Sequence, residues 1–229
     1  MSQPNKFLIF SLIFLMSCNL NHQSKNTKSE PIKYLALGDS YTIGESVLES
    51  ERWPVQLVNN LKAKNIDAEV NILAKTGWTT DELLKAIKDS TLTESYDLVS
   101  LLIGVNNQYR GRSVENFKEE FRVLLNTALA FAGNDPTKVF VVSIPDWGVT
   151  PFAMERDKDQ IAGEIDHFNQ ICEDVCLKNK VLFIDITDIS RNVYADEMLV
   201  AADGLHPSGK MYAQWVDRIF PYISEIIDN

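Results

Sequence analysis

Hydrophobic and polar positions along this 229-residue chain form a pattern that predicts strands separated by helices. Five short segments are almost continuously apolar, as expected for strands of a parallel sheet covered on both faces. They are residues 34–37, 68–73, 97–103, 139–143 and 181–185. Apolar residues recur at helical spacing over residues 51–64, 79–88, 113–132, 157–179 and 208–219. The pattern predicts a single α/β domain of three layers, α/β/α, around a five-stranded parallel sheet.

Residues at the helix ends support these boundaries. Thr79 and Glu82 stand at the spacing of a T-x-x-E capping box, which is typical of a helix start. Gly133 follows the third helix, and Ser208 precedes the last one. Pro221 is expected to bend or interrupt the chain beyond the last helix, because proline lacks the N–H that a helix needs.

The first residues have the composition of an export signal. Lys6 is followed by the apolar run 7–16 and then by the small residue Ser17, which is the pattern of a secretory signal peptide. Ten helical residues rise only about 15 Å, half of a bilayer core, so the run is too short for a membrane span. Residues 1–17 are therefore predicted to be a signal peptide, and residues 31–229 the folded domain.

Residues 15–18, Leu-Met-Ser-Cys, resemble a bacterial lipobox, in which the cysteine is lipidated and becomes the mature N-terminus. The resemblance implies a lipid on Cys18. Residues 18–30 are then a polar tether, because they hold almost no apolar side chains. A plain signal peptide with an incidental cysteine is the alternative. The expectation is an exported lipoprotein anchored to a membrane, on its periplasmic or cell-surface side.

Charge and cysteine content exclude several classes of protein. Asp and Glu number 32 against 22 Lys and Arg, which gives a net charge of −10. Such a chain is unsuited to neutralising phosphates, so no nucleic-acid partner is expected. Three histidines and three cysteines leave little room for zinc, and no metal site is predicted. Cys172 and Cys176 lie four residues apart on one predicted helix, either as a local disulfide or as two buried thiols.

Polar segments follow the first three predicted strands, and another precedes the last helix. Ligands of parallel sheets bind beyond the carboxyl ends of the strands, so these segments are the candidates for chemistry. They are Gly-Asp-Ser at 38–40, Lys-Thr-Gly-Trp at 75–78, Gly-Val-Asn-Asn at 104–107 and Asp-Gly-Leu-His-Pro at 203–207.

A serine, a histidine and an aspartate in these segments fit nucleophilic catalysis. A serine hydroxyl needs a base to take its proton, and His206 is the only histidine at a strand end or loop of the predicted domain. Asp203 lies three residues earlier, so a turn can bring its carboxylate onto the imidazole. Ser40, His206 and Asp203 are therefore the predicted catalytic residues. Asp39 is interpreted as structural, because adjacent side chains usually diverge.

Together the four segments resemble the GDSL esterases of the SGNH hydrolase superfamily, which is named for a Ser, a Gly, an Asn and a His in separate blocks. The matching residues are Ser40, Gly77, Asn106 and His206, in the family's order. The resemblance implies a flavodoxin-like SGNH hydrolase fold and no metal or organic cofactor. It also implies an oxyanion hole made by the backbone N–H groups of Ser40 and Gly77 and the amide of Asn106. A turn and a cap are the alternative roles of Gly77 and Asn106.

The chain departs from the family pattern at two positions. Tyr41 replaces the leucine of GDSL, a position outside the chemistry. Asn107 replaces the usual aspartate of the G-x-N-D block, which removes a charge that helps to order the loop. The G-x-S-x-G elbow of α/β-hydrolases is not satisfied, because Thr42 stands where its second glycine would be.

Aromatic and basic residues near these segments are candidates for substrate binding. Trp78, Tyr109 and Trp147 are predicted to form an apolar wall for the acyl group, with packing in the core as the alternative. Arg110 and Arg112 follow the Asn106 segment, where they could meet an anionic substrate group or be solvated.

The predicted function is a serine esterase that hydrolyses carboxylic esters through an acyl-enzyme intermediate. Lipid or lysophospholipid esters, thioesters and carbohydrate O-acetyl esters are all compatible substrates, so the partner is a small-molecule or glycan ester. Two alternatives use the same fold. One is a non-catalytic surface lipoprotein that binds glycans or lipids, and the other is an acyltransferase with the same triad.

Overall fold

The computed structural model of the chain describes residue 1, residues 30–92 and residues 95–228. The predicted signal peptide and Cys18 lie outside the described segments, so export and lipidation stay predictions. Of the helices in the described residues, none has both the length and the apolar character needed to cross a bilayer.

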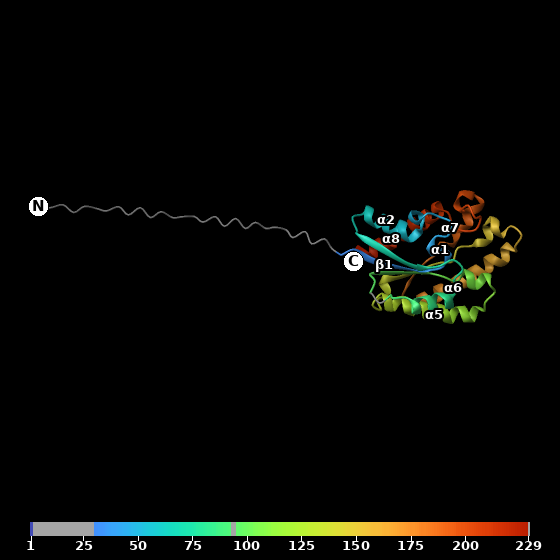
Figure 1. Ribbon diagram of the computed structural model, residues 1–229, viewed down its shortest axis with the longest axis horizontal. Helices are drawn as coiled ribbons and strands as arrows, with labels where there is room; N and C mark the ends of the chain where they lie inside the picture. The colour runs from blue at the N-terminus through green and yellow to red at the C-terminus, as the bar shows by residue number, and fades with distance from the viewer. Residues whose placement is uncertain (2–29, 93–94, 229) are drawn as a thin grey trace.

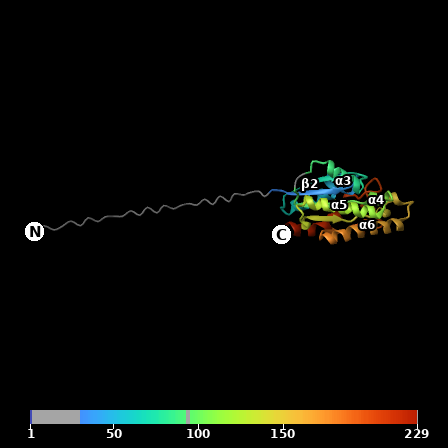
Figure 2. The same cartoon turned by 90° about the horizontal axis from the view of Figure 1, so that it is seen from below.

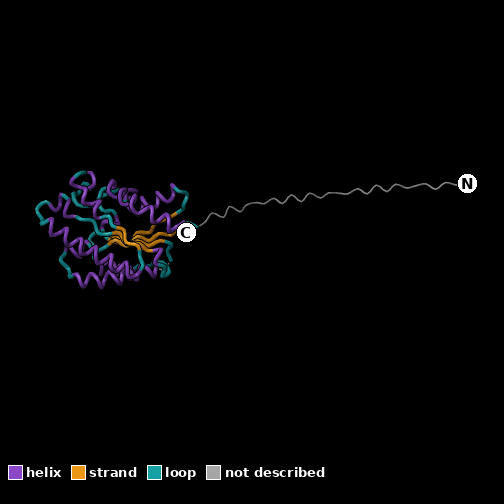
Figure 3. Tube along the Cα trace, turned by 180° about the vertical axis from the view of Figure 1, so that it is seen from behind, coloured by secondary structure: helices purple, strands orange, loops and turns teal. Residues whose placement is uncertain are grey.

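A five-stranded, all-parallel sheet forms the centre of the domain, as predicted (Figure 3). The strands are β1 (Ile32–Gly38), β2 (Ala68–Ala74), β3 (Leu98–Leu102), β4 (Val139–Val142) and β5 (Leu182–Ile184). Their order in the sheet is β2-β1-β3-β4-β5, and every neighbouring pair is parallel. The connections therefore change direction between β1 and β3. In open α/β sheets the ligand crevice lies at such a point.

Helices cover both faces of the sheet (Figure 1). On one face α2 (Trp53–Ala63) and α8 (Gly209–Asp228) lie against each other. On the other face α5 (Val114–Phe131) packs between α3 (Thr80–Asp89) and α6 (Lys158–Asn179) (Figure 2). The three-layer α/β/α prediction is confirmed.

Short helices that the sequence pattern did not predict fill many of the connections. The α-helical ones are α1 (Ser40–Ile43), α4 (Val105–Tyr109) and α7 (Thr187–Ser190). The 3₁₀ turns are η1 (Glu49–Glu51), η2 (Pro136–Lys138), η3 (Trp147–Val149), η4 (Pro151–Ala153), η5 (Arg191–Tyr194) and η6 (Glu197–Leu199). Two of the short helices, α1 and α4, begin within three residues of the ends of β1 and β3, at the edge where the crevice is expected.

The end of β1 requires a glycine. Gly38 pairs with Leu102 of β3, and a Cβ added at Gly38 would lie 2.5 Å from the Leu102 carbonyl oxygen. The same Cβ would lie 2.2 Å from Oγ1 of Thr42, one turn into α1. Only a residue without a side chain lets α1 begin directly beyond the strand. This close approach places Ser40 at the carboxyl edge of the sheet.

The last helix is longer than the sequence predicted. A bend or interruption was expected at Pro221, but α8 continues through it to Asp228. Proline inside a helix costs about 3 kcal/mol, because it removes one hydrogen bond and crowds the preceding turn. Ile219 and Ile223 are fully buried on either side of Pro221, and α8 packs on α2. Burial of this apolar face therefore outweighs the cost of the proline.

Cys172 and Cys176 are free, buried thiols on α6. Of the two alternatives given by their spacing, the structure has the pair of thiols and not the disulfide. Burial raises the pKa of Cys172 well above its ordinary value and that of Cys176 to about 12. Neither sulfur is therefore a reactive thiolate near neutral pH.

Candidate active site

The candidate nucleophile, Ser40, is the first residue of α1 and lies directly beyond β1. Asp39 caps this helix, because its Oδ1 accepts a hydrogen bond from the backbone N–H of Tyr41 at 3.0 Å. The carbonyl of Ser40 accepts hydrogen bonds from the N–H groups of Gly44 and Glu45, both at 3.0 Å. The backbone around the serine is thus fixed on both sides.

The candidate base and acid come from one tight turn ahead of α8. His206 Nδ1 lies 2.6 Å from Oδ2 of Asp203. A carboxylate can only accept, so Nδ1 donates its hydrogen and Nε2 is left as the proton acceptor. The backbone N–H groups of Leu205 and His206 both donate to Asp203 Oδ1 at 3.0 Å. The turn therefore fixes the carboxylate before it meets the ring.

A fourth hydrogen bond reaches Asp203 from a distant part of the chain. Ser46 Oγ donates to Asp203 Oδ2 at 2.7 Å, across 157 positions of sequence. Partial burial alone raises the pKa of Asp203, but the hydrogen bonds from His206, Leu205 and Ser46 outweigh it. They hold the pKa of Asp203 well below its usual range, so its carboxylate is charged at neutral pH.

Ser40, Asn106 and His206 line the same cavity, which has a volume of about 160 Å³. The rest of its lining consists of Tyr41, Val105, Tyr109, Trp147, Phe152 and Leu205. In the described part of the chain, no hydrogen bond joins Ser40 Oγ to the imidazole. Such catalytic contacts commonly tighten only when substrate binds. The structure thus gathers three of the residues predicted for catalysis and the oxyanion hole around a small cavity with a largely apolar wall.

Three aromatic rings form that wall. The ring centroids of Tyr109 and Trp147 lie 5.4 Å apart, and Phe152 lies 6.0 Å from Trp147 and 6.3 Å from Tyr109. Trp147 is buried and donates its indole N–H to Gln108 Oε1 at 2.8 Å. Tyr109 and Phe152 are nearly half exposed at the rim. Two of the three predicted wall residues therefore lie on the cavity.

The third predicted wall residue, Trp78, lies elsewhere. It is absent from the cavity lining and is partly buried against the hydrophobic core, which was the alternative for this residue. The backbone N–H of Trp78 donates to the carbonyl of Lys75 at 3.2 Å and closes the turn of residues 75–78. That turn directs the indole towards the core.

The two residues predicted as oxyanion donors besides Ser40 are joined through this turn. Gly77 has a φ of +87°, in the left-handed region that favours glycine. Asn106 Nδ2 donates to the carbonyl oxygen of Trp78 at 3.0 Å. An amide group has two N–H donors, so one remains for the cavity that Asn106 lines. Gly77 itself is not part of that lining, and the oxyanion roles stay predictions.

Asn107, which stands where the family has aspartate, is completely buried. Its Oδ1 accepts the backbone N–H of Thr80 at 3.0 Å, and its Nδ2 donates to Thr80 Oγ1 at 2.6 Å. The Thr80 hydroxyl donates in turn to Glu120. A neutral amide thus makes two bonds to the start of α3, whereas a carboxylate could only accept. The Asn107 side chain thus orders the α4 loop without the negative charge that an aspartate would carry.

The two arginines after Asn106 are engaged with protein groups. Arg110 Nη2 donates to the carbonyl of Gly77 at 2.6 Å, and Arg112 forms an ion pair with Asp81 at the start of α3. Neither belongs to the cavity lining. Both side chains bond protein groups and stay partly exposed to solvent, and contact with an anionic substrate group stays a prediction.

Sequence reasoning missed several residues at the site. Leu205 lines the cavity, and its position next to His206 was the available signal. Ser46 was not predicted, and for Arg110, already a candidate, the contact with Gly77 was missed. These two contacts cross 157 and 33 positions of sequence, and no local pattern predicts either of them. Such contacts arise only once the strands of the sheet are assembled.

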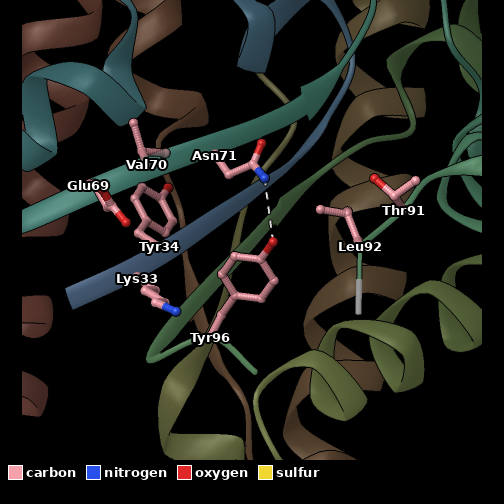
Figure 4. Close-up of a pocket in the computed structure, with 8 residues that line it drawn as sticks. All are labelled: Lys33, Tyr34, Glu69, Val70, Asn71, Thr91, Leu92 and Tyr96. Atoms are coloured by element: carbon pink, nitrogen blue, oxygen red, sulfur yellow. Dashed lines mark hydrogen bonds between the residues drawn. The ribbon is translucent and has the colours of Figure 1, made fainter. Parts of the chain in front are cut away.

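A second cavity, of about 320 Å³, lies at the opposite end of the sheet (Figure 4). Its lining comes from the first residues of β1 and β2 and from the chain before β3: Lys33, Tyr34, Glu69, Val70, Asn71, Thr91, Leu92 and Tyr96. This lining contains no serine, histidine or cysteine. In the segments that the structure describes, no cluster of three or more His, Cys, Asp or Glu side chains could hold a metal ion. The smaller cavity is therefore the candidate active site.

The fold and the site define a class of protein: α/β/α hydrolases with a serine after the first strand and an Asp-x-x-His turn before the last helix. Solved structures share this fold. TesA superposes with a TM-score of 0.66 at 20% identity, over 85% of this chain and 99% of its own. The lipase/acylhydrolase from Enterococcus faecalis gives 0.65 at 22% identity, over 85% and 96%. A variant of Axe2, an acetylxylan esterase from Geobacillus stearothermophilus, gives 0.66 at 17% identity, over 84% and 94%.

The family follows from the sequence itself. The model of the GDSL-like lipase/acylhydrolase family matches residues 36–214, and the chain belongs to that family. It is accordingly an acylhydrolase that acts on ester bonds. No curated protein sequence matches the chain significantly. The matched residues run from β1 into α8 and include all the residues of the cavity.

Proposed function

We propose that the protein cleaves carboxylic esters with Ser40 as nucleophile, His206 as general base and Asp203 as the residue that orients the imidazole. One observation carries the proposal: His206, held by Asp203 at 2.6 Å, lines the same small cavity as Ser40. The ionised carboxylate leaves Nε2 of the ring as the acceptor for the serine proton.

The reaction has two steps, acylation of Ser40 and hydrolysis of the acyl-enzyme. Ser40 Oγ attacks the carbonyl carbon, and its proton passes to His206 Nε2 while Asp203 stabilises the imidazolium. The imidazolium then gives the proton to the leaving oxygen, so that an alcohol departs and the acyl group stays on Ser40. A water molecule repeats the sequence and releases the acid. The negative charge on the carbonyl oxygen is held by the N–H groups of Ser40 and Gly77 and by the Asn106 amide. Each such donor is worth about 2.7–4 kcal/mol of barrier.

The size of the cavity favours a short acyl group. Pockets for drug-sized ligands span about 300–1,000 Å³. A cavity of about 150 Å³ is filled by one benzene molecule. The cavity beside Ser40 has about 160 Å³ and an apolar wall of Tyr109, Trp147 and Phe152. We infer that it takes acyl groups of a few carbons, such as acetyl to butyryl, and that the alcohol part lies outside the wall.

Two claims are tested together: that Ser40 is the nucleophile and that the cavity takes a short acyl group. The experiment measures hydrolysis of p-nitrophenyl esters from acetate to decanoate by the protein and by its Ser40→Ala variant. Turnover is expected to be fastest on the shortest esters and to fall on the order of 10⁶-fold in the variant, as for loss of other serine nucleophiles. Undiminished turnover by Ser40→Ala would refute the assignment of the nucleophile. An optimum at decanoate would refute only the short acyl group.

We also propose that the protein is exported and anchored through a lipid on Cys18. The predicted tether of residues 18–30 ends just before β1, which begins at Ile32, and Ser40 follows the end of the same strand. Seven strand residues span about 23 Å, so a tether at residue 30 leaves the cavity at the far end of the sheet from the membrane. Cys18→Ala is expected to move the protein out of the membrane fraction. An unchanged amount of the protein in the membrane fraction would contradict lipidation.

A further inference from the structure

The turn of residues 75–78 is tied to α4 by two hydrogen bonds. The carbonyl oxygen of Trp78 accepts Asn106 Nδ2 at 3.0 Å, and that of Gly77 accepts Arg110 Nη2 at 2.6 Å. Asn106 is in α4 and Arg110 is the C-cap of this helix, one turn later, so both side chains leave on the same face. Two successive carbonyl groups of the turn are thus held by one helix.

Further contacts fix the turn and the guanidinium. Arg110 Nη1 lies 3.4 Å from Oε2 of Glu82, and the same oxygen accepts the backbone N–H of Thr79 at 2.9 Å. On the other side of the turn, the hydroxyl of Thr76 donates to Glu45, just after α1. The turn therefore lies between the helix that begins with Ser40 and the helix that carries Asn106.

Gly77 makes this arrangement sensitive to Arg110. A glycine with φ of +87° has no side chain to limit its rotation. The nearest atom to a Cβ built there is Arg110 Nη2, at 3.6 Å. The hydrogen bond from Arg110 to the Gly77 carbonyl fixes one of the two peptide groups that meet at the Gly77 Cα, and the N–H of Gly77 belongs to the other. The bond thus limits the backbone freedom of the residue that carries this N–H.

We propose that Arg110 is a positioning residue for the oxyanion hole, which holds the Gly77 N–H and the Asn106 amide at a fixed spacing. The inference rests on the proposed function, in which both groups bind the carbonyl oxygen. Donors that are already in place need no reorganisation as charge develops on that oxygen. A displacement of about 1 Å costs roughly 10²-fold in rate.

The test compares Arg110→Ala with Arg110→Lys and with Arg112→Ala. Arg112 is the matched control, because it is two residues away and bonds Asp81 on α3 but not the turn. On p-nitrophenyl acetate we expect Arg110→Ala to lower kcat by roughly 10- to 100-fold with KM changed less than about twofold. Arg110→Lys restores part of the loss, since an ammonium group can still donate to the Gly77 carbonyl. Arg112→Ala keeps the kcat of the wild type.

A double variant and thermal unfolding separate positioning from stability. If Arg110 acts through the turn, Arg110→Ala adds less than about twofold to the loss already caused by Asn106→Ala, because the two variants disturb one unit. Equal kcat losses in Arg110→Ala and Arg112→Ala, or losses that follow Tm, would overturn the inference while the esterase assignment stands. A wild type that hydrolyses no ester would overturn the proposed function, and the inference with it.

Discussion

Two aspartates lie at the candidate active site, Asp39 next to Ser40 and Asp203 in the turn with His206, and their environments differ in opposite ways. Asp39, next to Ser40, is completely buried: its Oδ1 accepts the Tyr41 N–H, and its Oδ2 has no hydrogen-bond partner among the described residues. Burial raises the pKa of Asp39 to about 7, although backbone N–H groups such as that of Tyr41 lower it somewhat. Asp203 is partly exposed, and its hydrogen bonds hold its pKa well below the usual range.

The difference shows which environment suits which role. A carboxylate that must face an imidazolium needs to be charged, and the donors around Asp203 stabilise that form. A carboxyl group that only caps a short helix can be neutral, because its carbonyl oxygen still accepts the Tyr41 N–H. The two aspartates thus illustrate how hydrogen bonds and burial move pKa values apart within one site.

Neutralising Asp203 is expected to have the largest effect. In Asp203→Asn the amide still accepts backbone N–H groups through its oxygen, but it holds the imidazole in the wrong tautomer. We expect kcat to fall on the order of 10⁴-fold with the fold intact. Steady-state kinetics on p-nitrophenyl acetate measures this loss of kcat, and circular dichroism verifies that the variant is folded.

Asp39→Asn is the matched control for that variant, since it makes the same substitution at the other aspartate. A comparable collapse of kcat in Asp39→Asn would show that Asp39, and not Asp203 alone, serves the chemistry. Retention of most of the wild-type kcat in Asp203→Asn would remove Asp203 from the triad.

Asp39→Asn is expected to act on stability instead, and in a pH-dependent way. A raised pKa in the folded state gives a stabilising contribution that is complete below the unfolded pKa, near 4, and is lost as the pH rises to about 7. Asparagine does not titrate. The difference in free energy of unfolding between Asp39→Asn and the wild type should therefore rise in favour of the variant between pH 4 and 7. The expected rise is on the order of a few kcal/mol, since one pKa unit corresponds to about 1.4 kcal/mol.

Urea unfolding of both proteins at several pH values measures this difference. Asp203 is present in both, and its lowered pKa removes stability only as the pH falls below 4, so its contribution cancels. Parallel curves for wild type and Asp39→Asn across pH 4–7 would mean that Asp39 has an ordinary pKa.

The sequence predicted what depends on local pattern. Five apolar runs give the strands, and a separation of three positions between Asp203 and His206 is enough for a turn that joins them. The side of the site opposite this turn depends on contacts between distant segments. Asn106 bonds the carbonyl of Trp78 across 28 positions, and the Arg110 bond to Gly77 crosses 33. Periodicity does not encode such contacts, just as it did not show that α8 continues through Pro221.

The smallest expected effect tests how far Asp203 depends on its own turn. Ser46 supplies one of its four hydrogen bonds, from an exposed loop residue with φ of +66°. Loss of one bond of this kind costs about 1 kcal/mol, so Ser46→Ala should lower kcat by about fivefold. Ser46→Gly removes the same hydroxyl but tolerates the positive φ, so it should give the same kcat with higher stability. A loss above about 100-fold in either variant would mean that Ser46, and not the turn of residues 203–206, holds the carboxylate in place.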